Sequence, residues 1–78
     1  MRFLVLHGVN LNMFGKRDPT QYGTATLADI DTALQSLAKE LDVTVTSFQT
    51  NLEGAMVERI HQALGEGVDA VVINAGAW

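Results

Sequence analysis

Phe3-Leu4-Val5-Leu6, near the start of the chain, is a continuous run of apolar residues. Such a run, with no polar residue alternating inside it, is typical of a strand that is buried on both faces of a parallel sheet. A second run of this kind covers residues 68–73, is interrupted only by Asp69, and ends at Asn74. We therefore expect two fully buried strands, one near each end of the 78-residue chain.

A helix is expected directly before the middle of the chain. Apolar residues recur there at steps of three and four and form one stripe, as an amphipathic helix requires: Leu27, Ile30, Leu34, Leu37 and Leu41. Thr26 and Asp29 resemble a capping box at its start, although Asp is a weaker third-position partner than Glu. Val43-Thr44-Val45-Thr46 then alternates apolar and polar residues, which predicts a half-exposed edge strand.

A second helix is expected between this edge strand and the last apolar run. Either Thr50 or Asn51 is a suitable cap for its start, and Gly65 and Gly67 stop it. One face of this helix carries the apolar residues Met56, Ile60, Ala63 and Leu64. Of the acidic residues, those on or beside the two helices are expected to be solvated or to act as caps: Asp29, Asp31, Glu40, Glu53, Glu58 and Glu66.

The element order strand–helix–strand–helix–strand is the signature of an α/β protein with a parallel sheet. Because the two buried strands flank an alternating one in sequence, we expect the spatial order 2-1-3. Right-handed crossovers then place the two helices on opposite faces of the sheet. This is the first half of a flavodoxin-like three-layer sandwich, so residues 1–78 are expected to form a single partial domain, truncated after its third strand.

This topology also predicts where a ligand binds. Strand order reverses between the first and third strands, and ligands of open α/β sheets bind at the carboxyl ends of strands at such a point. The segment from Gly8 to Thr24, which holds the only proline, is expected to be a long loop leaving one of these ends. Long loops in compact domains are usually functional and often act as lids. The segment from Asn74 to Trp78 leaves the other strand end.

Arg17 and Tyr22 lie five residues apart in this loop and suggest a catalytic base. A phenol is a poor base at neutral pH because its pKa is about 10. Lowering that pKa to near 7 requires about 4 kcal/mol of preferential stabilisation of the phenolate. One guanidinium about 4 Å away supplies about this much at an effective dielectric constant near 20. Arg17 is therefore able to make Tyr22 a general base if the loop closes and excludes water.

Each of these polar residues also has a purely structural interpretation. Arg17 can be solvated while Tyr22 packs its ring on the surface. Asparagines that follow strands commonly bond to the backbone of a turn, which applies to Asn10, Asn12 and Asn74. The histidines are expected to be structural as well: His7 as a strand-end residue with a hydrogen-bonded ring, His61 as a packed or solvated helix residue.

Composition excludes several classes of function. The formal net charge is −4 and the five Lys and Arg residues are scattered, whereas nucleic-acid binding needs a basic stripe. The absence of cysteine excludes disulfides and thiolate metal sites, and the histidines lack carboxylates at ligand spacing. The loop has neither the glycine spacing of a dinucleotide site nor a P-loop. The amino-terminal apolar run is too short for an export signal or a membrane span, so we expect a cytoplasmic protein with no metal, membrane or nucleic-acid partner.

Several separated motifs, in register along the chain, resemble one family. Residues 8–19 with Tyr22-Gly23 resemble the G-P-N-L-N-x-L-G-x-R-x-P…Y-G signature of type II 3-dehydroquinate dehydratases. Residues 48–54 resemble the F-x-Q-S-N-x-E-G segment of that family, without the residue between its F and Q, and residues 60–63 and 73–77 match its second helix and third strand end. Val9 departs from the family in replacing a proline, and Trp78 stands where tyrosine or a small residue is commoner.

The resemblance implies dehydration of 3-dehydroquinate to 3-dehydroshikimate through an enolate, without metal or cofactor, in the shikimate or quinate pathway. It implies that Tyr22 is the proton acceptor and that Arg17 lowers its pKa and stabilises the transition state. It further implies that Asn10 lines the site near the enolate and that Asn74 binds the substrate ring hydroxyls. A complete enzyme of the family is expected to be a dodecamer built from trimers.

In that family, the general-acid histidine and the carboxylate-binding groups follow the segment that this chain resembles. Neither His7 nor His61 matches the position of that histidine. We therefore expect the chain to be the N-terminal part of such an enzyme and to be inactive alone. The alternative is a non-catalytic half-domain that binds small anions or pairs with another chain, because a buried third strand would have an unpaired edge.

Overall fold

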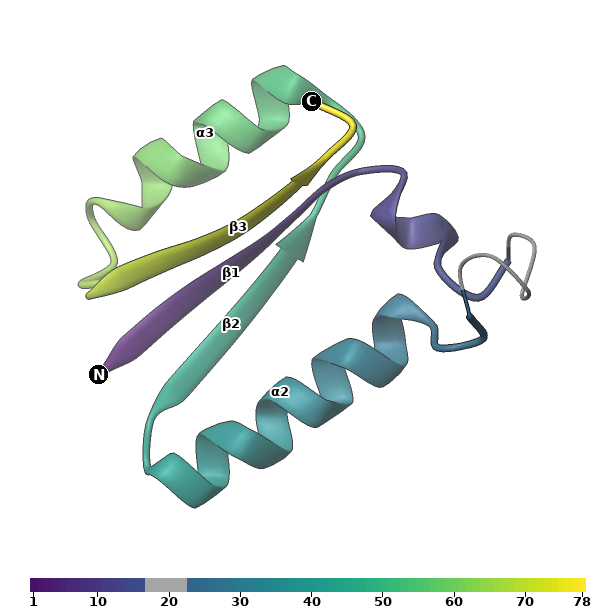
Figure 1. Ribbon diagram of the computed structural model, residues 1–78. Coiled ribbons are helices and arrows are strands. Elements are labelled where there is room, and N and C mark those ends of the chain that lie inside the picture. The colour runs from purple at the N-terminus through teal and green to yellow at the C-terminus, as the bar shows by residue number, and fades with distance from the viewer. Residues whose placement is uncertain (17–22) are drawn as a thin grey trace.

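In the computed structural model, which describes residues 1–16 and 23–78, three parallel strands form one sheet in the order β2-β1-β3. Strand β1 spans Arg2–Val9, β2 spans Thr44–Gln49 and β3 spans Ala70–Gly76. Figure 1 shows β1 between its two neighbours, with all strands running in the same direction. The predicted fold class and strand order are therefore confirmed.

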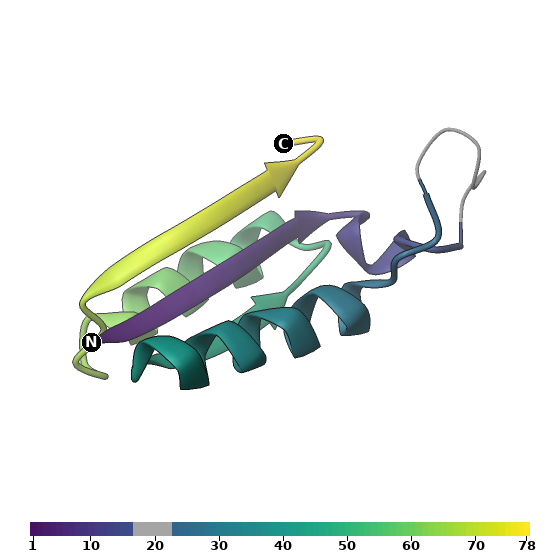
Figure 2. The ribbon, with the colours of Figure 1, turned by 60° about the horizontal axis from the view of Figure 1, so that its bottom comes forward.

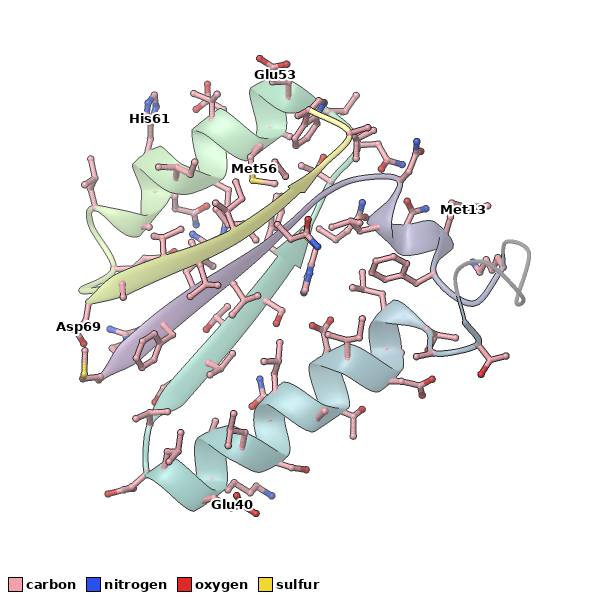
Figure 3. All side chains as sticks on the ribbon, in the orientation of Figure 1. Met13, Glu40, Glu53, Met56, His61 and Asp69 are labelled. Carbon is pink, nitrogen blue, oxygen red and sulfur yellow. The ribbon has the colours of Figure 1, made fainter. Side chains whose placement is uncertain are left out.

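The two helices cover opposite faces of this sheet, as right-handed crossovers require. Leu4 and Leu6 of β1 are fully buried and pack with Met56 and Ala63 of helix α3, which spans Glu53–Ala63. The alternate residues of β1 face helix α2, which spans Leu27–Leu41. Figure 3 shows Met56 directed towards the strands and His61 on the outer side of α3, where it is solvent-exposed.

Helix α2 begins where the sequence indicates. Thr26 is its N-cap, and its side chain accepts a hydrogen bond from the Asp29 backbone N–H at 3.1 Å. The Asp29 carboxylate in turn accepts from the Thr26 backbone N–H at 2.9 Å, which completes the capping box. These reciprocal bonds satisfy two amides that a helix start leaves without partners.

Helix α3 does not begin as predicted. Its N-cap is Leu52, which makes no side-chain capping bond. Thr50 instead accepts from the backbone N–H of Leu52 at 3.0 Å, and the side chain of Asn51 bonds to the turn after β1. Leu64 is also not part of the buried face, because it follows the last helical turn and is 87% exposed.

Strand β1 is longer than the apolar run that predicts it. The sequence suggests that His7 and Gly8 end the strand, but pairing continues to Val9, which lies opposite Gly76. A Cβ atom on Gly8 would lie 2.2 Å from the carbonyl oxygen of Ala75. Gly8 therefore allows a close approach of two strands, and the turn begins only at Asn10.

Strand β3 was predicted to be fully buried, and this is wrong for the described residues. Val71, Val72 and Ile73 are 44%, 54% and 51% exposed. The reason is topological, since β3 pairs with β1 on one side and with no described strand on the other. The prediction that Val43–Thr46 forms an edge strand is confirmed by β2, which continues to Gln49.

Candidate active site

A hollow of about 310 Å³ lies at the carboxyl ends of β1 and β3, where the strand order reverses. Its lining comes from the end of β1, the short 3-10 helix η1 (Leu11–Met13) and the end of β3: Val9, Asn10, Leu11, Phe14, Gly76 and Ala77. Figure 2 shows η1 lying beyond the end of β1. This is the position at which open α/β sheets bind ligands.

Asn10 connects β1 to η1 through an unusual backbone conformation. Its φ and ψ are 66° and 2°, in the left-handed region that asparagine tolerates better than most residues. Its carbonyl oxygen accepts from the Met13 N–H at 3.0 Å, which closes the first turn of η1. Asn10 is exposed and lines the hollow, so the structure brings this predicted site residue to the switch point.

Asn74 lies on β3 opposite His7 and is not among the residues that line this hollow. Its Oδ1 atom accepts a hydrogen bond from the Gly76 backbone N–H at 3.1 Å. This is the turn bond that the sequence leaves open as a structural interpretation. The amide nitrogen of Asn74 does not take part in that bond, so the side chain still has donors to offer.

His7 is 5% exposed, and its Nε2 atom lies 2.9 Å from the Oδ1 atom of Asp31 on helix α2. The expected hydrogen-bonded ring is therefore confirmed. The expectation that Asp31 is merely solvated is wrong, because its carboxylate contacts the buried ring of His7 between α2 and the sheet. The sequence signal that could have identified Asp31 is its position directly after Ile30 and three residues before Leu34, on the side of α2 that faces the sheet.

Three polar residues form a row across the carboxyl end of the sheet. His7 is paired with Gln49 on β2 and with Asn74 on β3. Paired residues of parallel strands project to the same face, so this row faces α2 and Asp31. The polar row (Gln49, His7 and Asn74) thus borders the strand ends from which the predicted site residues leave.

Gln49 and Asn51 were not predicted as site residues. The Nε2 atom of Gln49 donates to the Gly8 carbonyl oxygen at 3.2 Å and to Asn51 Oδ1 at 3.0 Å. Asn51 Oδ1 also accepts from the Asn10 backbone N–H at 2.8 Å. The sequence signal that points to them is their position at the end of a predicted strand and just after it, in a sheet whose parallel strands all end at the same edge.

The proposed base and its cation, Tyr22 and Arg17, lie outside the described residues, as do the others of segment 17–22. Lys16 and Gly23, the described residues on either side, are both exposed. The pairing of Arg17 with Tyr22 thus stays a prediction.

Among residues 1–16 and 23–78, no group of three or more His, Cys, Asp or Glu side chains is arranged to hold a metal ion. No helix in this part of the chain has the length and apolar character needed to cross a bilayer.

The chain matches one protein family over its whole length. The family model described as "Dehydroquinase class II" matches residues 1–78. A curated 3-dehydroquinate dehydratase of Leptothrix cholodnii is 67% identical over 78 residues, which are 100% of this chain and 52% of that relative. One from Pelobacter propionicus is 62% identical over 77 residues, covering 99% of this chain and 52% of its own length.

Solved structures give the same result. The type II dehydroquinase of Butyrivibrio crossotus superposes with a TM-score of 0.93 at 35% identity, over 99% of this chain and 53% of that one. The type II dehydroquinase of Propionibacterium acnes gives a TM-score of 0.88 at 42% identity, over 99% and 52%. The chain therefore spans about half the length of the curated relatives it matches.

Proposed function

This chain belongs to the class II dehydroquinase family, and from that premise we propose that it supplies the proton-abstracting half of a 3-dehydroquinate dehydratase. The reaction removes water from 3-dehydroquinate to give 3-dehydroshikimate, in the shikimate or quinate pathway. The observation that carries the proposal is that the family match covers residues 1–78, the full length of the chain.

The chemistry begins at the carbon next to the substrate ketone. Tyr22, as the phenolate, takes a proton from that carbon, and the electron pair of the broken C–H bond moves to form an enolate. Arg17 lowers the pKa of Tyr22 and stabilises the negative charge that develops. Breaking the C–O bond to the leaving hydroxyl then requires a proton from a general acid, and water leaves.

The hollow at the strand ends supports this assignment. Asn10 lines it, and an amide donor there is suited to the oxygen of an enolate. Asn74 lies on β3 opposite His7 of β1, and we propose that its amide nitrogen binds ring hydroxyls of the substrate. The proposal uses no metal or cofactor.

The described histidines are poor candidates for the general acid. His7 is buried and paired with Asp31, and His61 is exposed on α3, which packs on the face opposite to the polar row. We therefore place the general acid in the part of the relatives' length that this chain does not match. As a consequence, the 78-residue chain alone is expected to show no measurable turnover.

A chimera provides the direct test. In it, this chain replaces the matched segment of the Leptothrix cholodnii relative, to which it is 67% identical. We expect the chimera to convert 3-dehydroquinate, measured by the ultraviolet absorbance of the conjugated enone product. A chimera that has the circular dichroism spectrum of the folded relative but no turnover would refute the proposal.

A second candidate function is a non-catalytic half-domain that pairs with another chain or binds small anions. The exposed edge of β3 favours it, because Val71, Val72 and Ile73 offer an apolar strand for pairing. Under this hypothesis the chimera would show little or no turnover, and Tyr22→Phe would not change it. The catalytic proposal predicts a near-complete loss instead.

The assembly and location of the enzyme also belong to the proposal. We propose a homo-oligomer, a dodecamer built from trimers, located in the cytoplasm. Light scattering of the chimera tests the oligomeric state, and fractionation of the cells that make the protein tests its location. Neither measurement depends on the chemistry.

A further inference from the structure

The last residue of β2 and the two residues after it bind the end of β1 through backbone and side-chain hydrogen bonds. The Thr50 backbone N–H donates to the His7 carbonyl oxygen at 3.2 Å. Gln49 Nε2 donates to the Gly8 carbonyl oxygen, and Asn51 Oδ1 accepts from the Asn10 N–H. Residues 49–51 therefore contact three of the four residues 7–10 by hydrogen bonds.

The orientation of both amide side chains follows from this arrangement. A backbone N–H can only donate, so the atom of Asn51 that meets the Asn10 N–H must be the oxygen. A backbone carbonyl can only accept, so the atom of Gln49 that meets the Gly8 carbonyl must be the nitrogen. The 3.0 Å contact between Gln49 Nε2 and Asn51 Oδ1 then joins a donor to an acceptor without further assumption.

The turn that these bonds hold is the one with the left-handed backbone. Asn10 has φ of 66°, and its N–H bond to Asn51 is 2.8 Å long. Directly before it, Val9 approaches Gly76 so closely that a Cβ atom on Gly76 would lie 2.6 Å from the Val9 carbonyl oxygen. Asn10 is thus fixed between a tight strand contact on one side and an amide bond on the other.

We propose that Gln49 and Asn51 form an amide clamp, a pair of positioning residues that hold the Asn10 turn and so orient its side chain in the hollow. The clamp acts through Asn10 and need not touch substrate. The inference rests on the proposed function for its catalytic consequence, but the clamp itself is a structural property that can be measured without activity.

The clamp is tested by amide hydrogen exchange at Asn10 in the chimera. Asn51→Ala removes the acceptor, and exchange of the Asn10 amide should accelerate about tenfold, as expected for one lost hydrogen bond. Asn51→Asp keeps an acceptor oxygen and should retain the protection. Gln62→Ala removes an exposed amide side chain of α3 and is the matched control, with no change expected at Asn10.

The catalytic consequence is tested by a double-mutant cycle. Asn51→Ala should lower kcat about tenfold with a smaller change in KM, because the clamp orients a group that acts in the transition state. Asn10→Gly removes the side chain while tolerating the left-handed turn. In that background Asn51→Ala should have almost no further effect on kcat, since the residue through which it acts is gone.

The outcomes separate the two proposals. If the chimera is folded but inactive, the proposed function fails, while exchange at Asn10 still decides whether the clamp exists. Unchanged exchange in Asn51→Ala overturns the clamp, whatever the activity. If exchange accelerates but the losses in kcat from Asn10→Gly and Asn51→Ala simply multiply, Asn51 does not act through Asn10 and the positioning role is refuted.

Discussion

The Nε2 atom of His7 lies 2.9 Å from the Oδ1 atom of Asp31, which ties the buried end of β1 to helix α2. His7 is 5% exposed, whereas the Asp31 side chain is 35% exposed. The histidine depends more on this bond, because its ring nitrogen has little access to water as a substitute partner.

Asp31→Ala should therefore destabilise the fold by about 1–3 kcal/mol, the cost of leaving a buried polar atom without a partner. Chemical denaturation of the chimera, followed by circular dichroism, measures the change. Glu40→Ala removes an exposed carboxylate from the same helix and should change stability by less than about 0.5 kcal/mol. Equal effects of the two substitutions would show that the His7 contact contributes nothing.

Gly8→Ala tests the close approach of β1 and β3. The added Cβ atom would lie 2.2 Å from the Ala75 carbonyl oxygen and would force the strands apart, so we expect a loss of at least about 1–3 kcal/mol. Gly54→Ala is the matched control, because a Cβ atom on Gly54 meets nothing within 4 Å. Gly54 lies in the first turn of α3, outside the helix interior where glycine is costly, so Gly54→Ala should change stability by less than about 0.5 kcal/mol. The denaturation midpoint should fall for Gly8→Ala and stay nearly unchanged for Gly54→Ala.

Tyr22→Phe should lower kcat about 10²- to 10⁴-fold in the chimera, the range that general-base catalysis contributes. The substitution keeps the ring and removes only the group that accepts the proton, so substrate binding should be less affected. Steady-state kinetics with 3-dehydroquinate provide the measurement. Full activity in this variant would transfer the role of base to another residue.

Arg17→Gln tests whether a cation makes that base effective. The base must be deprotonated to work, so activity rises with pH through the pKa of Tyr22. Removing the guanidinium raises that pKa, and the acidic limb of the pH profile of kcat/KM should move to higher pH. A lower rate with an unmoved acidic limb would mean that Arg17 stabilises the transition state without acting on the base.

The pattern of apolar residues predicts the parts of this fold that depend on short-range order. The stripe from Leu27 to Leu41 and the Thr26–Asp29 capping box give helix α2, and the order of elements gives the sheet topology. What a linear pattern cannot contain is contact between distant residues. Gly8 is part of β1 because it packs closely against Ala75 of β3. Asn51 does not cap α3 because its side-chain oxygen accepts a hydrogen bond from the Asn10 backbone N–H.

In the candidate site, too, the sequence predicts some residues and misses those that depend on contacts between distant residues. Asn10 could be predicted at the hollow from topology, whereas the polar row and the amide clamp depend on the register between strands. The burial of β3 was overestimated. An apolar run indicates that the side chains of a strand are suited to burial, but the described residues do not bury those of β3.

The uncovered strand leads to a prediction in which one substitution has opposite effects in two settings. Val72 is 54% exposed and lines an apolar hollow of about 240 Å³ between the sheet and α2. An exposed apolar edge promotes association, so Val72→Lys should reduce concentration-dependent self-association of the 78-residue chain. In the chimera, where the remainder of the relative is present to cover the hollow, the same charge would be buried and should destabilise the fold.

Thr46→Lys, at an exposed position of β2, is the control and should be tolerated in both proteins. Sedimentation of the chain and denaturation of the chimera measure the two effects, and equal tolerance of Val72→Lys in both would mean that this edge of the sheet is never covered.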